Sequence, residues 1–333
     1  MIALAGQGWN ILGGYGGQYS FGHAAFFGTG AYVTAILQVR YGVNAWFGFA
    51  AGIAAGAALG GALGALVFRS GLRGSYFALV TLAFAEVLRI IASVAPITGA
   101  GVGTLIKLDL GIRTFQFQSR AAFYWIILAL VGVSLVLAQL IERSRFGAWL
   151  IAVRENEDAA KALGVDASTV KTVAMVISAA ITAAAGCFYA QYFLFVDSGI
   201  AYGTWISIEA LLTPIIGGVG TVFGPLLGAL VVKTLGEAAK LLTGDAPGLD
   251  LIIYGTVLVL VIWIMPRGLI GGLASARKLM RREAPAAPDR GGAPWLSALL
   301  AVDGVTCRFG GLVAVNAASL GCPRGTNYSA DRS

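Results

Sequence analysis

The sequence predicts an all-α protein, a polytopic bundle of transmembrane helices that ends in a short β-like fragment. Hydrophobic residues make up 58% of the 333 residues and charged residues 12%, about half of the charged share in soluble domains. The 47 glycines are about twice the usual share, and small residues are typical of membrane helices that approach one another closely. Apolar runs with the length of one membrane crossing recur along the chain.

This pattern divides the chain into three parts. Residues 1–272 form a transmembrane domain, residues 273–298 a basic cytoplasmic linker rich in Pro, Ala and Gly, and residues 299–333 a separate C-terminal fragment. The first part contains about eight apolar segments. In chain order they are Ile2–Tyr15 (short and broken by glycines), Phe21–Leu37, Trp46–Phe68, Tyr76–Ala95, Ala122–Ile141, Thr172–Val196, Ile206–Leu242 and Leu251–Met265.

Lys and Arg residues assign the loops to the two sides of the membrane. Most of them fall in the tail after Met265, in the loop Arg69–Arg73 and in a polar segment, Glu142–Lys171, so we place these three on the cytoplasmic side. The outer loops hold Arg40, Lys107, Arg113 and Arg120. Membrane orientation thus accounts for the net charge of +7, and we expect membrane lipid, not nucleic acid, as a partner.

The same orientation requires the segment Ile206–Leu242 to bend back on itself. An even number of crossings must separate Asp197 from Asp245, because the polar segment and the tail both lie inside. Pro214 and the run GGVGTVFGP from Gly217 to Pro225 provide a break. The alternative is one tilted helix with a proline kink.

Broken helices mark translocation paths in transporters, so Gly217, Gly218 and Gly220 are candidates for the path. Glu86 and Arg89, at i, i+3 inside an apolar segment, are either a pathway pair or, as we favour, a self-neutralising pair that fixes packing. The remaining path candidates are Gln18, Ser20 and His23. A histidine at the start of a span is more often a packing residue than a ligand.

Catalytic and metal-binding patterns are absent from the sequence. It contains no HExxH, GxSxG or GxxxxGK[ST] motif, and one His with three Cys at unpaired spacings supports neither a metal site nor a disulfide framework. We therefore expect a protein that is not an enzyme and that has no catalytic residue, cofactor or metal.

The polar segment Glu142–Lys171 carries most of the charge in the middle of the chain. Within it, NEDAAKAL predicts a short helix that is capped by Asn156 and ends at Gly164, before a further cap at Asp166 or Ser168. Spacing alone leaves two interpretations open: a docking surface for a cytoplasmic partner, or an ordinary amphipathic loop.

Several stretches resemble one family in the order in which that family has them. They are GWNILGGYGGQYSFGHAAFFGTGAY (Gly8–Tyr32), YFALVTLAFAEVLRI (Tyr76–Ile90), SRFGAWLIAVRENEDAAKALGV (Ser144–Val165), IIGGVGTVFGPLLGAL (Ile215–Leu230) and IMPRGLIGG (Ile264–Gly272). Together they resemble the LivM-type permease subunits of branched-chain amino-acid ABC transporters. The chain departs from the family at its start, where only seven residues precede the first motif and relatives usually carry another apolar helix.

The resemblance implies a multi-pass subunit of the bacterial inner membrane. Its partners would be a second, homologous permease, two cytoplasmic ABC ATPase subunits and a periplasmic solute-binding protein. The family's ATPase-coupling loop falls on Arg154, Glu155, Glu157, Asp158, Ala159, Ala160 and Gly164.

The C-terminal fragment resembles the same system's ATPase. The stretch LLAVDGVTCRFGGLVAVNAASLGCPRG (Leu299–Gly325) is similar to the first strands of a LivG-type ATPase, but no phosphate-binding loop follows it in the sequence. We therefore expect a truncated ATPase fragment that hydrolyses no ATP.

The predicted function is import of branched-chain amino acids, or of related small amphiphilic solutes such as amides and urea, driven by ATP hydrolysis on the partner subunits. The alternative is an ion-coupled secondary transporter that uses Glu86 as its coupling carboxylate. A docking loop favours the first, because a secondary transporter needs none.

Overall fold

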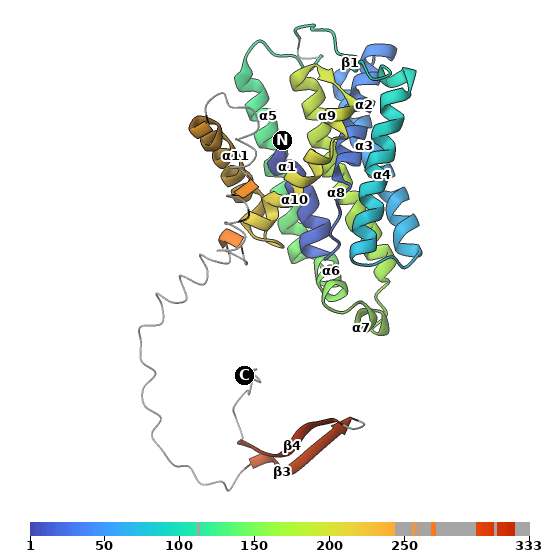
Figure 1. Ribbon diagram of the computed structural model, residues 1–333. Helices are drawn as coiled ribbons and strands as arrows, with labels where there is room; N and C mark the ends of the chain where they lie inside the picture. Colours follow the sequence, from blue (N-terminus) through green and yellow to red (C-terminus); the bar gives the residue numbers. More distant parts are fainter. Residues whose placement is uncertain are drawn as a thin grey trace. The chain divides into compact units, whose positions relative to one another are not determined.

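The computed structural model describes residues 1–111, 114–243, 255–256, 259, 268–270, 298–309 and 312–323. The chain divides into two compact units, Met1–Leu279 and Met280–Ser333, and each is considered by itself. The first is a helical bundle (Figure 1), in agreement with the predicted class. The predicted segment Leu251–Met265 and the linker lie largely outside the described residues.

The first helix is the centre of the bundle. Helix α1 (Ile2–Trp9) continues directly into the π-helix η1 (Asn10–Tyr15), and residues 4–16 are all buried. The predicted interruption by glycines is therefore a change from α to π geometry. Helix α1 packs against α8, α10 and α11, so the short predicted segment is core rather than periphery.

Three further helices pack closely on one another: α2 (His23–Tyr41), α3 (Ala45–Arg69) and α8 (Ala167–Phe193), of which α8 also packs against α1. Their contacts use small residues. Gly56 of α3 meets Ala183 of α8, and Gly186 of α8 lies against the backbone of Phe27, where a Cβ would overlap. The glycine enrichment thus serves close backbone approach.

Helices α4 (Ser75–Val94) and α5 (Arg120–Arg143) lie at the periphery and expose large apolar side chains, as lipid contact requires. Between them come the 3₁₀ turn η2 (Pro96–Thr98) and the strand β1 (Thr104–Leu105), which pairs antiparallel with β2 (Phe195–Val196) after α8. This pairing places the two loops predicted to lie outside on the same side of the bundle.

At another end of the bundle, α6 (Arg145–Glu155) and α7 (Glu157–Ala162) form an angled pair that we call the elbow. Arg73, in the loop between α3 and α4, contacts Glu157 at 3.3 Å and Asp158 at 3.4 Å. The prediction that this loop and the polar segment share one side is confirmed.

After the short helix α9 (Ser198–Ala201), the helices α10 (Thr204–Gly217) and α11 (Gly224–Thr243) form an antiparallel hairpin. Close contacts join Gly217 with Gly224 at the turn, Thr213 with Gly228 one turn further on, and Glu209 with Lys233 beyond that. The predicted return at the glycine-rich run is confirmed, and the alternative of one kinked helix is wrong.

Among the described residues, five helical stretches are long and apolar enough to cross a membrane: α3, α4, α5, α8 and Ser198–Gly217. The chain is thus a polytopic helical membrane protein, while the predicted number of about eight segments stays a prediction. In the second unit, β3 (Ala298–Phe309) and β4 (Leu312–Pro323) pair as an antiparallel hairpin, with Phe309 opposite Leu312.

Candidate functional site

The elbow is shaped by hydrogen bonds at its helix ends. The side-chain oxygen of Asn156 accepts from the backbone N–H groups of Asp158 (3.1 Å) and Ala159 (3.0 Å), so Asn156 caps α7 as predicted. Gly164 follows α7 with a left-handed φ of +85°. Of the two caps predicted for α8, Asp166 is the one that the structure uses.

Glu157 anchors the elbow to the bundle. One of its carboxylate oxygens contacts Lys171 at 2.6 Å and Arg73 at 3.3 Å, and the other contacts Lys161 at 2.9 Å. Burial acts to raise the pKa of Glu157, but hydrogen bonds from Lys171 and Lys161 outweigh it and leave the pKa below its ordinary value. Glu157 is therefore turned toward the bundle and not outward.

The outward surface of the elbow comes from other residues. The side chains of Glu155 and Asp158 are 67% and 78% exposed, and Leu163 is 86% exposed. Of the remaining predicted residues, Ala159 and Gly164 are exposed and Ala160 is buried. Leu163 gives this surface an apolar contact point that was not predicted from the sequence. Its position, directly before the glycine that ends the helix, could have indicated an exposed leucine.

Arg154 connects the elbow to the interior of the bundle. Its Nη1 donates to the carbonyl of Gly14 in η1 at 2.9 Å, and its Nη2 contacts Glu155 at 2.7 Å. The Arg154 side chain also fills the space beside Gly17 and lies next to Gly220, between α10 and α11. One side chain of the elbow therefore touches both the first helix and the turn of the hairpin.

The turn between α10 and α11, residues 218–223, is held by the first helix, and we call it the break. The Asn10 side chain donates to the carbonyl of Thr221 (2.9 Å) and accepts from the N–H of Gly220 (2.9 Å), while Gln7 donates to the carbonyl of Val222 (3.2 Å). Polar side chains thus satisfy backbone groups that leave the helical pattern, which irregular backbone inside a membrane protein requires.

The three predicted glycines each meet a specific demand at the break. Gly218 has φ +135° and Gly220 has φ +72°, conformations that side chains disfavour. Gly217 is buried, and a Cβ there would overlap the carbonyl of Gly224.

The predicted polar residues at the start of α2 lie in or near the core. His23 is fully buried, and its Nε2 is 2.9 Å from the hydroxyl of Ser178 on α8. Ser20 is buried and accepts from the N–H of Gly22, while Gln18 is half-buried and donates to a backbone carbonyl. Each makes a hydrogen bond within the chain, as expected for His23 as a packing residue, although the buried Nδ1 of His23 has no partner among the described residues. The role of all three in the path stays a prediction.

Glu86 and Arg89 form the predicted pair, with Arg89 Nη2 at 2.5 Å from Glu86 Oε1. Their side chains are 42% and 36% exposed, so the pair lies on an outward-facing part of α4. A role in the path stays a prediction for these two residues as well.

The structure adds a pair of charges that the sequence analysis missed. Glu209 Oε1 of α10 lies 2.9 Å from Lys233 Nζ of α11, and the Glu209 side chain is 7% exposed. Both residues are charges inside the apolar segment Ile206–Leu242, and folding that segment at its glycine-rich run brings them opposite one another. Both facts can be read from the sequence, so the pair could have been predicted from it.

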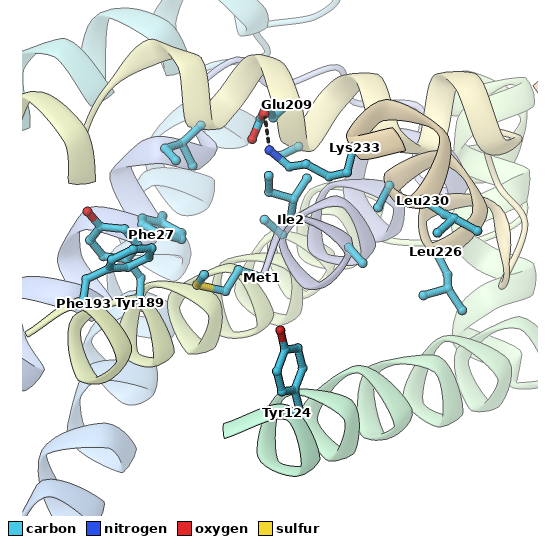
Figure 2. Close-up of a pocket in the computed structure, with 15 residues that line it drawn as sticks. Met1, Ile2, Phe27, Tyr124, Tyr189, Phe193, Glu209, Leu226, Leu230 and Lys233 are labelled. Carbon is cyan, nitrogen blue, oxygen red and sulfur yellow. Dashed lines mark hydrogen bonds and ion pairs between the residues drawn. The ribbon is translucent and has the colours of Figure 1, made fainter. Parts of the chain in front are cut away.

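The pair lies in the wall of a cavity of about 820 Å³, which we call the groove (Figure 2). Its other walls are mainly apolar and come from several helices, and the N-terminal amino group of Met1 lies near the pair. Tyr124 of α5 faces it from one side, and the remaining labelled side chains are Met1, Ile2, Phe27, Tyr189, Phe193, Leu226 and Leu230. Among the residues that the structure describes, no cluster of His, Cys, Asp and Glu could hold a metal ion.

Comparison with known proteins gives consistent matches over the helical unit. A family model described as "Branched-chain amino acid transport system / permease component" matches residues 1–262. The high-affinity branched-chain amino acid transport system permease protein LivM of Salmonella typhimurium is 30% identical over 291 residues, which are 80% of this chain and 67% of that protein.

Two other relatives extend the comparison. LivM of Escherichia coli is 31% identical with the same coverage of both chains. The permease protein LivH of Salmonella typhimurium is 28% identical over 170 residues, 51% of this chain and 52% of that protein. No solved structure gives a significant match.

Proposed function

The chain belongs to the branched-chain amino acid transport system permease family, and from this membership we propose that it is one permease subunit of an ABC importer in the inner membrane of a bacterium. Its solute is a branched-chain amino acid. A second, homologous permease completes the membrane part, two ABC ATPase subunits bind on the cytoplasmic side, and a periplasmic binding protein delivers the solute. The partners hydrolyse the ATP.

The observation that carries this proposal is the contact made by Arg154. It lies at the C-terminal end of α6, next to the exposed residues of the elbow, and bonds the carbonyl of Gly14 while lying beside Gly220. A displacement of the elbow by an ATPase subunit therefore reaches both the first helix and the break. Glu157 keeps the elbow from moving independently of the bundle, because Arg73 and Lys171, which lie outside the elbow, hold it.

The docking step is tested by a substitution on the outward surface of the elbow. In the co-expressed complex, Leu163→Asp places a charge at an apolar contact that is 86% exposed in the isolated chain, and the ATPase subunits are expected to dissociate. Leu105→Asp is the matched control, because Leu105 is 70% exposed and lies in β1, away from the elbow. Unchanged co-purification of the ATPases with the Leu163 variant would refute docking at this surface.

The transport step is tested in proteoliposomes that contain the complete complex. Uptake of radiolabelled leucine is expected only with ATP on the ATPase side and solute-loaded binding protein on the other. The same assay with urea and acetamide separates the amino acid from the related solutes. Leucine uptake that follows an ion gradient without ATP would overturn the proposal.

We also propose that residues 299–333 correspond to the first strands of an ATPase of the same system. The support is the sequence similarity of Leu299–Gly325 together with the antiparallel pairing of β3 with β4. No ATP hydrolysis is expected from the purified chain alone, and turnover by that material would refute this assignment.

A further inference from the structure

The strongest unassigned feature of the molecule is the groove beside Glu209 and Lys233. We propose that this groove contacts the transported amino acid, with Lys233 binding its carboxylate, Glu209 its ammonium group and the apolar walls its branched side chain. This inference rests on the proposed function and names the residues that touch the solute.

The groove separates charged and apolar surface in the way that such a solute requires. Glu209 and Lys233 lie together on the hairpin side, joined by the dashed contact in Figure 2. The aromatic rings of Phe27, Tyr189 and Phe193 lie at one end, and Leu226 and Leu230 of α11 line another wall. Mostly apolar pockets with a few placed polar groups are typical of small-molecule sites.

The two charges match a zwitterion and do not match an ion of one sign. A lysine ammonium has three N–H donors and a carboxylate has two acceptor oxygens, while the 2.9 Å contact between them involves Nζ and Oε1. An amino acid can therefore bond to both groups at once. A zwitterion carries no net charge, so its binding adds none to the groove, which matters because unpaired charge at membrane depth is costly.

The volume also fits the solute. A cavity of about 820 Å³ falls within the roughly 300–1,000 Å³ of ordinary ligand pockets, so it accommodates one leucine together with water at the charged side. Since a binding protein delivers the solute in the proposed importer, two charge-assisted bonds and an apolar contact suffice for a transient stop along the path.

A membrane lipid fits the groove less well. Lys233 precedes Thr243, the last residue of α11, by ten positions, which is about 15 Å along the helix axis. A phospholipid headgroup stays at the membrane surface, so only acyl chains would reach this depth, and they carry no charge to match Glu209 and Lys233. The chemistry of the pair therefore points to the amino acid.

The position of the pair also links the site to the elbow. Glu209 and Lys233 belong to the two helices of the hairpin, and Arg154 of the elbow lies beside Gly220 in the turn of the same hairpin. Opening or closing of the hairpin would change the distance between the two charges, and with it the hold on the solute.

Photo-crosslinking of the complete complex in lipid nanodiscs tests the proposal. The probe is photo-leucine, a diazirine analogue that keeps the amino and carboxyl groups. We expect labelling on groove residues such as Tyr189, Phe193 or Leu230, suppressed by excess leucine. Labelling that lies only outside the groove, or that excess leucine leaves unchanged, would overturn the inference.

A double substitution tests the charges. In Glu209→Gln/Lys233→Met neither charge is left unpaired, so the complex should assemble normally. Uptake of leucine from saturating binding protein is expected to fall about tenfold to a hundredfold, as loss of a charge-assisted bond predicts. The control is Glu237→Gln/Lys240→Gln, which removes an exposed pair from the same helix and should leave uptake unchanged.

The possible outcomes are distinguishable. If the wild-type complex imports no leucine with ATP, the proposed function fails. If it imports leucine and the double variant does so at the same rate, the function stands and the groove is not the site.

A second measurement tests the groove even if the double variant fails to assemble. In Leu230→Cys, the maleimide reactivity of the new thiol, compared with the unsubstituted chain, should fall with leucine but not with 4-methylpentanoate or isopentylamine, which each lack one charge. Protection by none of the three, or equally by all three, would overturn the inference.

Discussion

Two of the ion pairs inside predicted membrane helices differ in how they form. Glu86 and Arg89 are one turn apart on α4 and are partly exposed, whereas Glu209 and Lys233 come from two helices and Glu209 is buried. The first pair forms whenever α4 is helical. The second exists only while the hairpin is closed. A pair whose geometry depends on helix packing can report and respond to helix movement, and a pair within one helix cannot.

The largest expected effect comes from forcing the hairpin open. A Cβ at Gly228 would overlap the carbonyl of Thr213, so Gly228→Ala should separate α10 from α11 and break the Glu209–Lys233 contact while leaving Glu86–Arg89 intact. Overpacking of this kind costs on the order of 3 kcal/mol. Thermal unfolding of the purified complex measures it, with Gly132→Ala on α5 as the control, since nothing lies near a Cβ there. Equal melting of the two variants would contradict the close packing.

The next effect comes from removing one partner of each pair. Lys233→Met leaves the Glu209 carboxylate buried without its partner, and the stability of the complex should fall by about 3 kcal/mol. Arg89→Met, its counterpart on α4, should lower the melting temperature less, because the Glu86 carboxylate that it leaves is 42% exposed and the Glu209 carboxylate only 7%. A loss of stability in the Arg89 variant equal to that of the Lys233 variant would remove the distinction between the pairs.

The sequence predicted the features that depend on local spacing or on the side of the membrane where each loop lies. The Asn156 cap, the end of the helix at Gly164 and the Glu86–Arg89 pair follow from spacing within one turn, and the hairpin follows from counting crossings between loops of known charge. Glu209–Lys233 was missed because its two residues are far apart in the chain and become neighbours only after the fold at Gly217. The inward turn of Glu157 was missed for the same reason, since Arg73 and Lys171 come from other segments.

Glu157 extends the comparison to the elbow: like Glu209, and unlike Glu86, it has partners on other segments, Arg73 and Lys171. Glu157→Gln should cost about 2 kcal/mol, the value of a hydrogen bond to a charged group. Amide exchange in α7 should become faster while the bundle stays protected. Asp158→Asn is the control, because that side chain is 78% exposed. Equally fast exchange in both variants would refute the anchoring role.

The lowered pKa of Glu157 gives the same contact a pH dependence with a definite sign. The unfolded carboxyl titrates near about pH 4.3 and the folded one lower, so the stabilisation is fully present above that value and is lost as the pH falls through the lowered pKa. Wild-type α7 should therefore remain protected from pH 7 down to about pH 4.5. Loosening already at pH 6 would contradict a lowered pKa.

The smallest expected effect belongs to Glu86, and it decides between the two transport mechanisms. A coupling carboxylate must gain and lose an ion during transport, but Glu86 is held by Arg89 at 2.5 Å on a partly exposed part of α4. Glu86→Gln should therefore leave ATP-driven leucine uptake unchanged, while Glu209→Gln in the same assay should reduce it. The measurement is uptake into proteoliposomes with ATP and no ion gradient, then with a proton or sodium gradient and no ATP. Uptake under the second condition that disappears in the Glu86 variant would reverse the ranking of the two pairs, because the local pair would then carry the driving ion and the interhelical pair would be structural.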